Sequence, residues 1–153
     1  MHLDIFGKMV YGWEMSLHPD SSLVRESFKR ASKVIKRYVD SIEGIIFHQD
    51  QGSAYTSELY LRSVINQDGI LSYSRKGEPG DNAVNESFFS RLKEEWRDVF
   101  YEARSFEELK RLISKAIRYY NTRRYHSSLG YMTPYEFLKQ EMASLYLPYK
   151  LVS

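Results

Sequence analysis

Two carboxylates, Asp50 and Glu86, are the residues whose spacing points most directly to chemistry. Thirty-five residues separate them, and Lys93 follows seven residues after Glu86. Carboxylates that converge without a neighbouring base repel each other and require a cation. Hard oxygen ligands select Mg²⁺ or Mn²⁺, and a pair of such ions can drive an in-line displacement at phosphorus. We therefore predict that Asp50 and Glu86 bind metal for catalysis and that Lys93 contacts a phosphate.

Each of these residues also has a plain structural interpretation. Asp50 could cap a turn after a strand, Glu86 could be a solvated helix residue, and Lys93 could be a surface lysine. His48 and Asp50, two positions apart, could belong to a metal site of another kind. The chain has no cysteine and no second histidine at ligand spacing, which disfavours that site. We expect His48 to position substrate or water, or to pack beside the site.

Two elements must position the carboxylates. The apolar run over residues 45–48 predicts a strand buried on both faces, as in a parallel sheet. Asp50 follows this strand, and ligand sites in α/β sheets lie at the carboxyl ends of strands. A helix predicted over residues 82–97 carries Glu86 and Lys93 just beyond the rim of its apolar stripe. That stripe comprises Val84, Phe88, Phe89, Leu92 and Trp96.

The remaining pattern is that of a mixed α/β chain. Its order of strand, strand, helix, strand, helix, strand, helix, helix predicts an α/β sandwich. We expect a hairpin in residues 1–17, with strands at Leu3–Phe6 and Met9–Trp13, and then a helix after Asp20. A second helix should run from about Ser57 to Asn66, followed by a strand over residues 70–74. Two further helices should begin at the capping boxes Ser105–Glu108 and Thr133–Glu136.

The net charge of +2 conceals two basic blocks. Residues 25–37 hold six basic side chains against one acidic one, and residues 104–126 hold seven against two. Such blocks indicate a polyanionic partner, although solvated helix faces give the same pattern. We expect DNA contacts from Arg123, Arg124 and His126, and the alternative is that they complement a helix C-terminus.

Composition excludes several classes of protein. The absence of cysteine removes disulfides, thiolate metal sites and a cysteine nucleophile. No apolar stretch reaches the length of a membrane span, and no signal peptide is visible. We therefore predict a cytoplasmic protein that does not contact a membrane.

The motifs resemble those of bacterial insertion-sequence transposases with a retroviral-integrase-type catalytic core. The resemblance covers about residues 3–140 and is carried by five segments. These are Asp4–Trp13, His48–Ser57, Ser74–Gly77, Asp81–Glu95, and Tyr119–Tyr131 followed by Thr133–Pro134.

This resemblance implies a ribonuclease-H-like fold, a mixed sheet flanked by helices, over residues 1–141, with a tail over 142–153. It implies Mg²⁺, transposon ends and target DNA as partners, a homo-oligomer, and end cleavage with strand transfer. Asp50 and Glu86 would be the second and third acidic ligands, and Lys93 matches a basic position of the family. Arg75 and Lys76 would join Lys93 in contacting DNA.

One departure from the family is serious. The first catalytic aspartate of the family lies on a central first strand that is missing from this chain, and Asp4 matches a different, non-catalytic position. We therefore expect a gap or unusual pairing in the sheet, and no cleavage or strand transfer by the chain alone. The alternatives are a non-catalytic DNA-binding remnant or regulator of an insertion element, and a ribonuclease-H-like nuclease of another kind.

Overall fold

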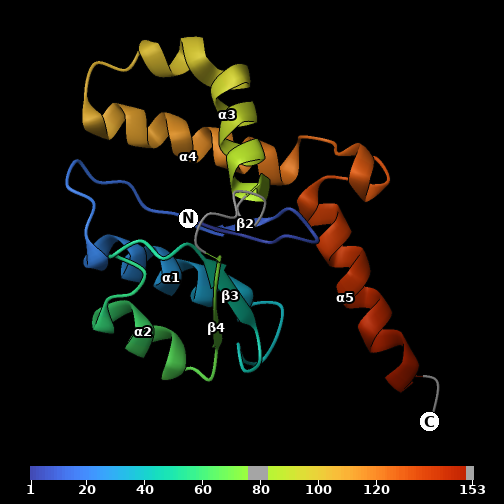
Figure 1. The fold of residues 1–153 in the computed structure, drawn as a ribbon. Helices are drawn as coiled ribbons and strands as arrows, with labels where there is room; N and C mark the ends of the chain where they lie inside the picture. Colours follow the sequence, from blue (N-terminus) through green and yellow to red (C-terminus); the bar gives the residue numbers. More distant parts are fainter. Residues whose placement is uncertain (76–82, 151–153) are drawn as a thin grey trace. The chain divides into compact units, whose positions relative to one another are not determined.

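The computed structural model describes residues 1–75 and 83–150, and its contacts divide the chain into two units (Figure 1). The first unit comprises residues 1–3 and 10–91, and the second comprises residues 4–9 and 92–153. The first holds β1 (His2–Leu3), β2 (Val10–Gly12), α1 (Ser21–Ile35), β3 (Ile46–Gln49), α2 (Glu58–Ile65), β4 (Ile70–Tyr73) and the start of α3 (Ala83–Tyr101). The second holds the rest of α3, then α4 (Phe106–Thr122), a 3₁₀ turn (Ser127–Leu129) and α5 (Pro134–Lys150).

The strands of the first unit form two separate pairs. β1 pairs with β2 antiparallel, and β3 pairs with β4 parallel. Within residues 1–75 and 83–150, no ladder joins the two pairs. The sequence predicted an interrupted sheet, and the described strands have this arrangement.

Two expectations about the strands are wrong. β1 ends at Leu3 rather than at Phe6, because the chain turns there and the Asp4 N–H donates to the Met9 carbonyl at 2.8 Å. β3 is not buried on both faces, since Ile46 is 64% exposed while Phe47 and Gln49 are buried. β3 has one strand neighbour in the described sheet, and its burial alternates as in a strand covered on a single face.

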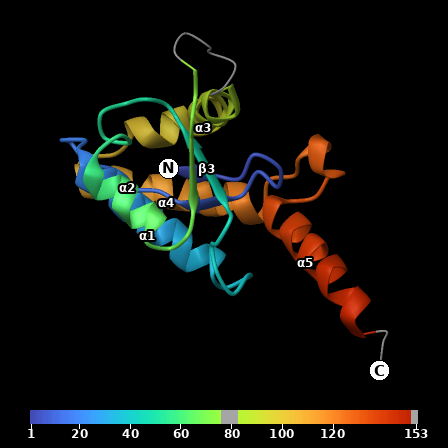
Figure 2. The ribbon, with the colours of Figure 1, turned by 60° about the horizontal axis from the view of Figure 1, so that its bottom comes forward.

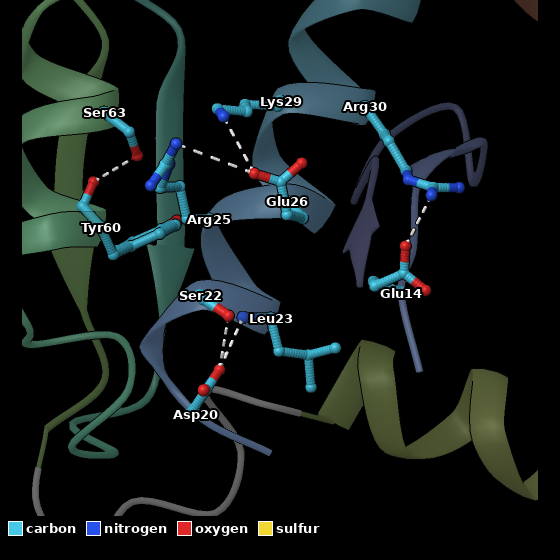
Figure 3. A network of polar contacts seen from close by, with 10 residues as sticks. All are labelled: Glu14, Asp20, Ser22, Leu23, Arg25, Glu26, Lys29, Arg30, Tyr60 and Ser63. Carbon is cyan, nitrogen blue, oxygen red and sulfur yellow. Dashed lines mark hydrogen bonds and ion pairs between the residues drawn. The ribbon is translucent and has the colours of Figure 1, made fainter. Parts of the chain in front are cut away.

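The helix α1 begins as the sequence predicts. Asp20 is its N-cap and accepts a hydrogen bond from the Leu23 N–H at 3.0 Å (Figure 3). The apolar face of α1 enters the core of the first unit. The buried core residues are Val24, Phe28, Ala31, Ile35, Ile42, Phe47, Tyr60 and Val64.

The basic face of α1 is partly neutralised. Lys29 contacts Glu26 at 2.9 Å, and Arg30 contacts Glu14 at 2.7 Å (Figure 3). The other basic residues towards the end of the helix are exposed. These are Lys33, Lys36 and Arg37. Fewer basic side chains of this region are therefore available to bind a polyanion than the count of charges suggests.

Helices α1 and α2 run side by side in the first unit (Figure 2). Phe28 of α1 packs edge-on against Phe47 of β3 and Tyr60 of α2, with ring centroids 5.1 and 6.0 Å away. On the hairpin side, Gly12 approaches the backbone of α1 so closely that a Cβ atom would lie 2.4 Å from the Ala31 nitrogen. Aromatic packing and this close approach together fix α1 against the strands.

His2 completes the aromatic core. Its ring nitrogens lie 3.1 Å from the Ser27 hydroxyl and 3.5 Å from the Tyr60 hydroxyl. The ring also packs against Phe28 and Phe47 at about 6 Å. Burial lowers the pKa of His2 to about 3, with a smaller contribution from the nearby positive amino terminus.

The second unit is organised by two capping boxes, both predicted from sequence. At α4 the Ser105 hydroxyl accepts from the Glu108 N–H at 3.1 Å. At α5 the contact is reciprocal, because the Thr133 hydroxyl accepts from the Glu136 N–H while the Glu136 carboxylate accepts from Thr133. The pKa of Glu136 is lowered mainly because its carboxylate accepts a hydrogen bond from the Thr133 N–H.

The helix α5 continues through residue 142, and the division into a core and a tail at that point stays a prediction. The loop over residues 4–9 belongs to this unit through Phe6, whose ring packs on Phe137 of α5 at 5.3 Å. In the described part of the chain, no helix is both long and apolar enough to cross a membrane.

We predict that the stability of the first unit depends on the protonation of His2. The unfolded chain takes up a proton near pH 6.5, whereas folded His2 does so only near 3, so the stability conferred by neutral His2 is present above pH 6.5 and is lost as the pH falls towards 3. The free energy of unfolding should fall by about 1.4 kcal/mol per pH unit between about pH 6 and 5.

Urea unfolding followed by circular dichroism measures this dependence. In His2→Phe the slope over that range should flatten, because the variant has no proton to gain. His18→Gln serves as the control, since His18 is exposed and its loss should leave the slope unchanged. An identical slope in wild type and His2→Phe would contradict the prediction.

Candidate active site

The position of Asp50 is set by hydrogen bonds between the ends of the two parallel strands. The Ser74 N–H donates to the Gln49 carbonyl at 2.8 Å, and the Gln51 side-chain amide donates back to the Ser74 carbonyl at 3.1 Å. Asp50 lies between these two attachment points. It therefore occupies the carboxyl end of a parallel strand pair, where the sequence placed it.

The Asp50 carboxylate is exposed and oriented. Its Oδ1 accepts a hydrogen bond from the Gly52 N–H at 2.9 Å, so the turn-capping role is realised for one oxygen. The carboxylate also acts on Tyr55, whose pKa is raised first by burial and then by the charge of Asp50. Turn capping holds the side chain in place while its exposure leaves it accessible to a cation.

His48 is a structural residue rather than a free ligand. Its Nδ1 lies 3.0 Å from the Ser72 hydroxyl and its Nε2 lies 3.1 Å from the Ser74 hydroxyl. Both ring nitrogens are therefore occupied by contacts across β3 and β4. Of the roles considered from the sequence, packing beside the site fits this geometry.

Glu86 and Lys93 lie on the exposed face of α3. Phe88 and Leu92 are buried, whereas Glu86 and Lys93 are exposed, as the helical wheel predicts for these four residues. Phe89, which the wheel places in the apolar stripe, is instead 45% exposed. Glu86 lies in the first turn of the helix, where the helix dipole favours a negative charge. The first turn of α3 therefore presents the Glu86 side chain to solvent.

The carboxylates of Asp50 and Glu86 suit a hard divalent cation, but that they bind one together stays a prediction. The described residues contain no group of three or more histidine, aspartate or glutamate side chains able to hold a metal. Residues 76–82 lie between β4 and α3, so Lys76 and Asp81 lie outside the described residues. Arg75, the last described residue before that segment, is exposed. Exposed carboxylate oxygens on Asp50 and Glu86 are the ligands that Mg²⁺ prefers.

The predicted DNA-contacting residues after α4 divide into two kinds. Arg123 is exposed. Arg124 is held by Glu95 of α3, with Nε and Nη2 at 2.8 and 2.7 Å from Oε1, and its side chain is only 18% exposed. This hydrogen bond is the main reason that the pKa of Arg124 is raised. His126 packs edge-on against Tyr120 with ring centroids 4.9 Å apart.

An aromatic pocket on the second unit was missed from sequence. It has a volume of about 510 Å³ and is lined by Glu95, Trp96, Tyr119, Arg124 and Tyr125. The sequence contained a hint of this pocket, because Tyr119 and Tyr125 flank the basic residues Arg123 and Arg124. Their convergence depends on the pairing of α3 with α4, which no local pattern encodes.

We predict that Glu95 and Arg124 are energetically coupled. A double-mutant cycle with Glu95→Gln and Arg124→Gln should give a coupling energy of about 1 kcal/mol, the upper end for partly exposed pairs, because two guanidinium nitrogens contact the carboxylate and the Arg124 side chain is only 18% exposed. The matched control is the fully exposed pair Glu58 and Arg62 on α2, where about 0.3–0.5 kcal/mol is expected. Coupling energies that are equal for the two pairs, measured by urea unfolding, would contradict this.

Comparison with known proteins agrees with this geometry. Residues 69–134 match the family described as Integrase core domain. The transposase for insertion sequence element IS904 from Lactococcus lactis is 40% identical over 140 residues, covering 91% of this chain and 53% of that protein. The putative transposase InsK for IS150 from Escherichia coli is 35% identical, covering 90% and 47%.

The chain thus spans about half the length of these curated relatives. Among solved structures, the catalytic core domain of BIV integrase superposes with a TM-score of 0.63 at 18% identity, covering 91% of this chain and 86% of that one. This likeness shows the fold, which is the ribonuclease-H-like α/β fold predicted from sequence. The chain is therefore similar in sequence to insertion-sequence transposases and similar in fold to an integrase catalytic core.

Proposed function

We propose that the chain supplies part of the catalytic core of a DNA transposase, acting in end cleavage and strand transfer. The observation that carries the proposal is the exposed, oriented carboxylate of Asp50 at the carboxyl end of a parallel strand pair. Glu86 and Lys93 add support, because both fall within the segment that matches the integrase core family. The relatives named as transposases favour DNA as the substrate.

In this proposal Asp50 and Glu86 bind Mg²⁺ or Mn²⁺, and Lys93 contacts a DNA phosphate. The bound ions would supply Lewis-acid activation of the attacking oxygen and stabilisation of the leaving one. The Gly52 N–H keeps the Asp50 carboxylate oriented. Lys93 lies two helical turns beyond Glu86 on the same helix, so its ammonium group can bind the backbone next to the scissile phosphate.

We further propose that these 153 residues alone do not catalyse cleavage or joining. Two carboxylates hold a metal pair poorly, and Asp4 matches a non-catalytic position of the family rather than its first catalytic aspartate. Because the substrate would be bacterial DNA, the proposal implies a cytoplasmic protein. Because two transposon ends would have to be joined, it also implies a homo-oligomer.

A second candidate function is DNA binding without catalysis. The exposed basic residues favour it, because they can bind phosphates whether or not a metal site is complete. At the end of α1 and just after it these are Lys33, Lys36 and Arg37, and on α4 they are Arg111, Lys115 and Arg118.

We predict that Asp50→Asn and Glu86→Gln each weaken Mn²⁺ binding about tenfold, or about 1.4 kcal/mol, because each removes one ligand. Mn²⁺ titration followed by electron paramagnetic resonance measures this affinity. Glu102→Gln, which changes an exposed glutamate just beyond α3, is the matched control and should bind Mn²⁺ as wild type does. Affinities that are the same in all four proteins would contradict a site at Asp50 and Glu86.

The same preparation tests catalysis directly. With Mg²⁺ and a labelled transposon end, the wild-type chain alone should yield no joined product. Mg²⁺-dependent joining that Asp50→Asn abolishes would show that these residues suffice, and would refute the proposed incompleteness.

We predict that DNA binding is steeply salt-dependent. Each phosphate contact releases counterions, so the slope of log K against log salt concentration should shift by about 0.9 when one contact is lost. Lys115→Gln and Arg118→Gln should each reduce the slope by that amount in fluorescence anisotropy titrations. Arg62→Gln is the control, because Arg62 is exposed but paired with Glu58. An affinity that does not change with salt would argue against both candidate functions.

A further inference from the structure

The aromatic pocket of the second unit has an unusual combination of linings. Trp96, Tyr119 and Tyr125 supply ring surface, while Glu95 and Arg124 supply a neutralised ion pair. Tyr119 is 44% exposed and Tyr125 is 65% exposed. Side chains of this size usually bury more of their surface, so the exposed rings present apolar area to solvent at an open cavity.

Neighbouring side chains hold the pocket in shape. The indole of Trp96 stacks on Phe100 with ring centroids 6.3 Å apart and an interplanar angle of 25°. It also meets Tyr119 edge-on at 5.9 Å. The Glu95 carboxylate fixes the Arg124 guanidinium beside these rings. A ligand would therefore enter a surface that is already ordered.

Arg124 keeps hydrogen-bonding capacity for a ligand. A guanidinium has five N–H donors. Within the described residues, contacts with Glu95 and His126 account for three of them. Two donors are left beside the aromatic rings, and they suit a neutral acceptor such as a carbonyl oxygen or ring nitrogen.

The chemistry of the pocket favours a flat, neutral, hydrogen-bond-accepting ring over other ligands. A small cation would find no unpaired carboxylate among the lining residues, because Glu95 is already neutralised by Arg124. An aliphatic side chain would leave the remaining N–H donors without an acceptor. A nucleobase offers two aromatic faces and acceptor atoms on its edge, and its flanking phosphates would lie near the exposed residues Arg118 and Arg123.

We propose that Trp96, Tyr119 and Tyr125 form a stacking site for an unpaired nucleobase of single-stranded DNA, with Arg124 donating to the edge of the base. This inference rests on the proposed DNA-directed function and adds the form of DNA that the second unit recognises. A paired base presents no free face, so the site distinguishes a single-stranded extension from a blunt duplex. Recognition by stacking tolerates many sequences.

The test compares three labelled DNAs by fluorescence anisotropy: a blunt duplex, the same duplex with a short single-stranded extension, and the same duplex with an abasic extension. The abasic extension keeps the phosphates and removes the bases. Wild type should bind the base-bearing extension about five- to 150-fold more tightly than the abasic one, the range for stacking of one base.

Variants of Tyr125 assign the effect to the pocket. Tyr125→Ala should abolish the preference for bases over abasic sites, whereas Tyr125→Phe should retain it, because the ring is kept. Tyr101→Ala is the matched control, since Tyr101 is a still more exposed tyrosine of the same unit outside the pocket. With Trp13 changed to Phe, quenching of Trp96 fluorescence by the base-bearing extension alone provides a second readout.

The possible outcomes separate the two proposals. Failure to bind any of the three DNAs would overturn the DNA-directed function and the stacking site together. Binding to the duplex with equal affinity for the base-bearing and abasic extensions would overturn the stacking site alone. A Tyr125→Ala variant that keeps the preference for bases but changes its oligomeric state in sedimentation would assign the pocket to a protein contact instead.

Discussion

The attachment of the end of β3 to the end of β4 is the constraint on which the candidate active site depends. Ser74 accepts from Gln51 and donates to Gln49, and His48 bridges two hydroxyls across the same strands. These bonds leave little freedom to the loop that carries Asp50. A carboxylate on an unconstrained loop would lose ordering entropy on binding an ion, whereas this one is already oriented. The fold thus holds one carboxylate of the proposed metal site in place within a single strand pair.

The parts predictable from sequence are those determined by neighbours along the chain. The caps at Asp20, Ser105 and Thr133 depend on residues within three or four positions, and all three were predicted. The parallel pairing of β3 agrees with the parallel sheet expected for residues 45–48, although the identity of its partner, β4, was not predicted. The exposure of Ile46 did not, because an apolar run has the same composition whether one face of the strand is covered or two.

The basic blocks show a second limit of sequence reasoning. Counting charges treats each arginine as available, but Arg30 is paired with Glu14 and Arg124 with Glu95, partners 16 and 29 positions away. Some of the acidic residues that balance the total charge are therefore paired directly with arginines of the basic blocks. For the same reason the pocket beside Arg124 could not be anticipated, since its walls come from α3, α4 and the segment after α4, which only the tertiary fold brings together.

The close approach of Gly12 to α1 limits how this domain can be re-engineered. A Cβ at position 12 would overlap backbone atoms of both Ser27 and Ala31, and backbone atoms cannot swing aside as a flexible side chain can. Saturation libraries would therefore yield no tolerated replacement there. Diversity for altered specificity is better introduced on the outward arc of α1, where Lys29 and Lys33 can change without disturbing the packing between helix and hairpin.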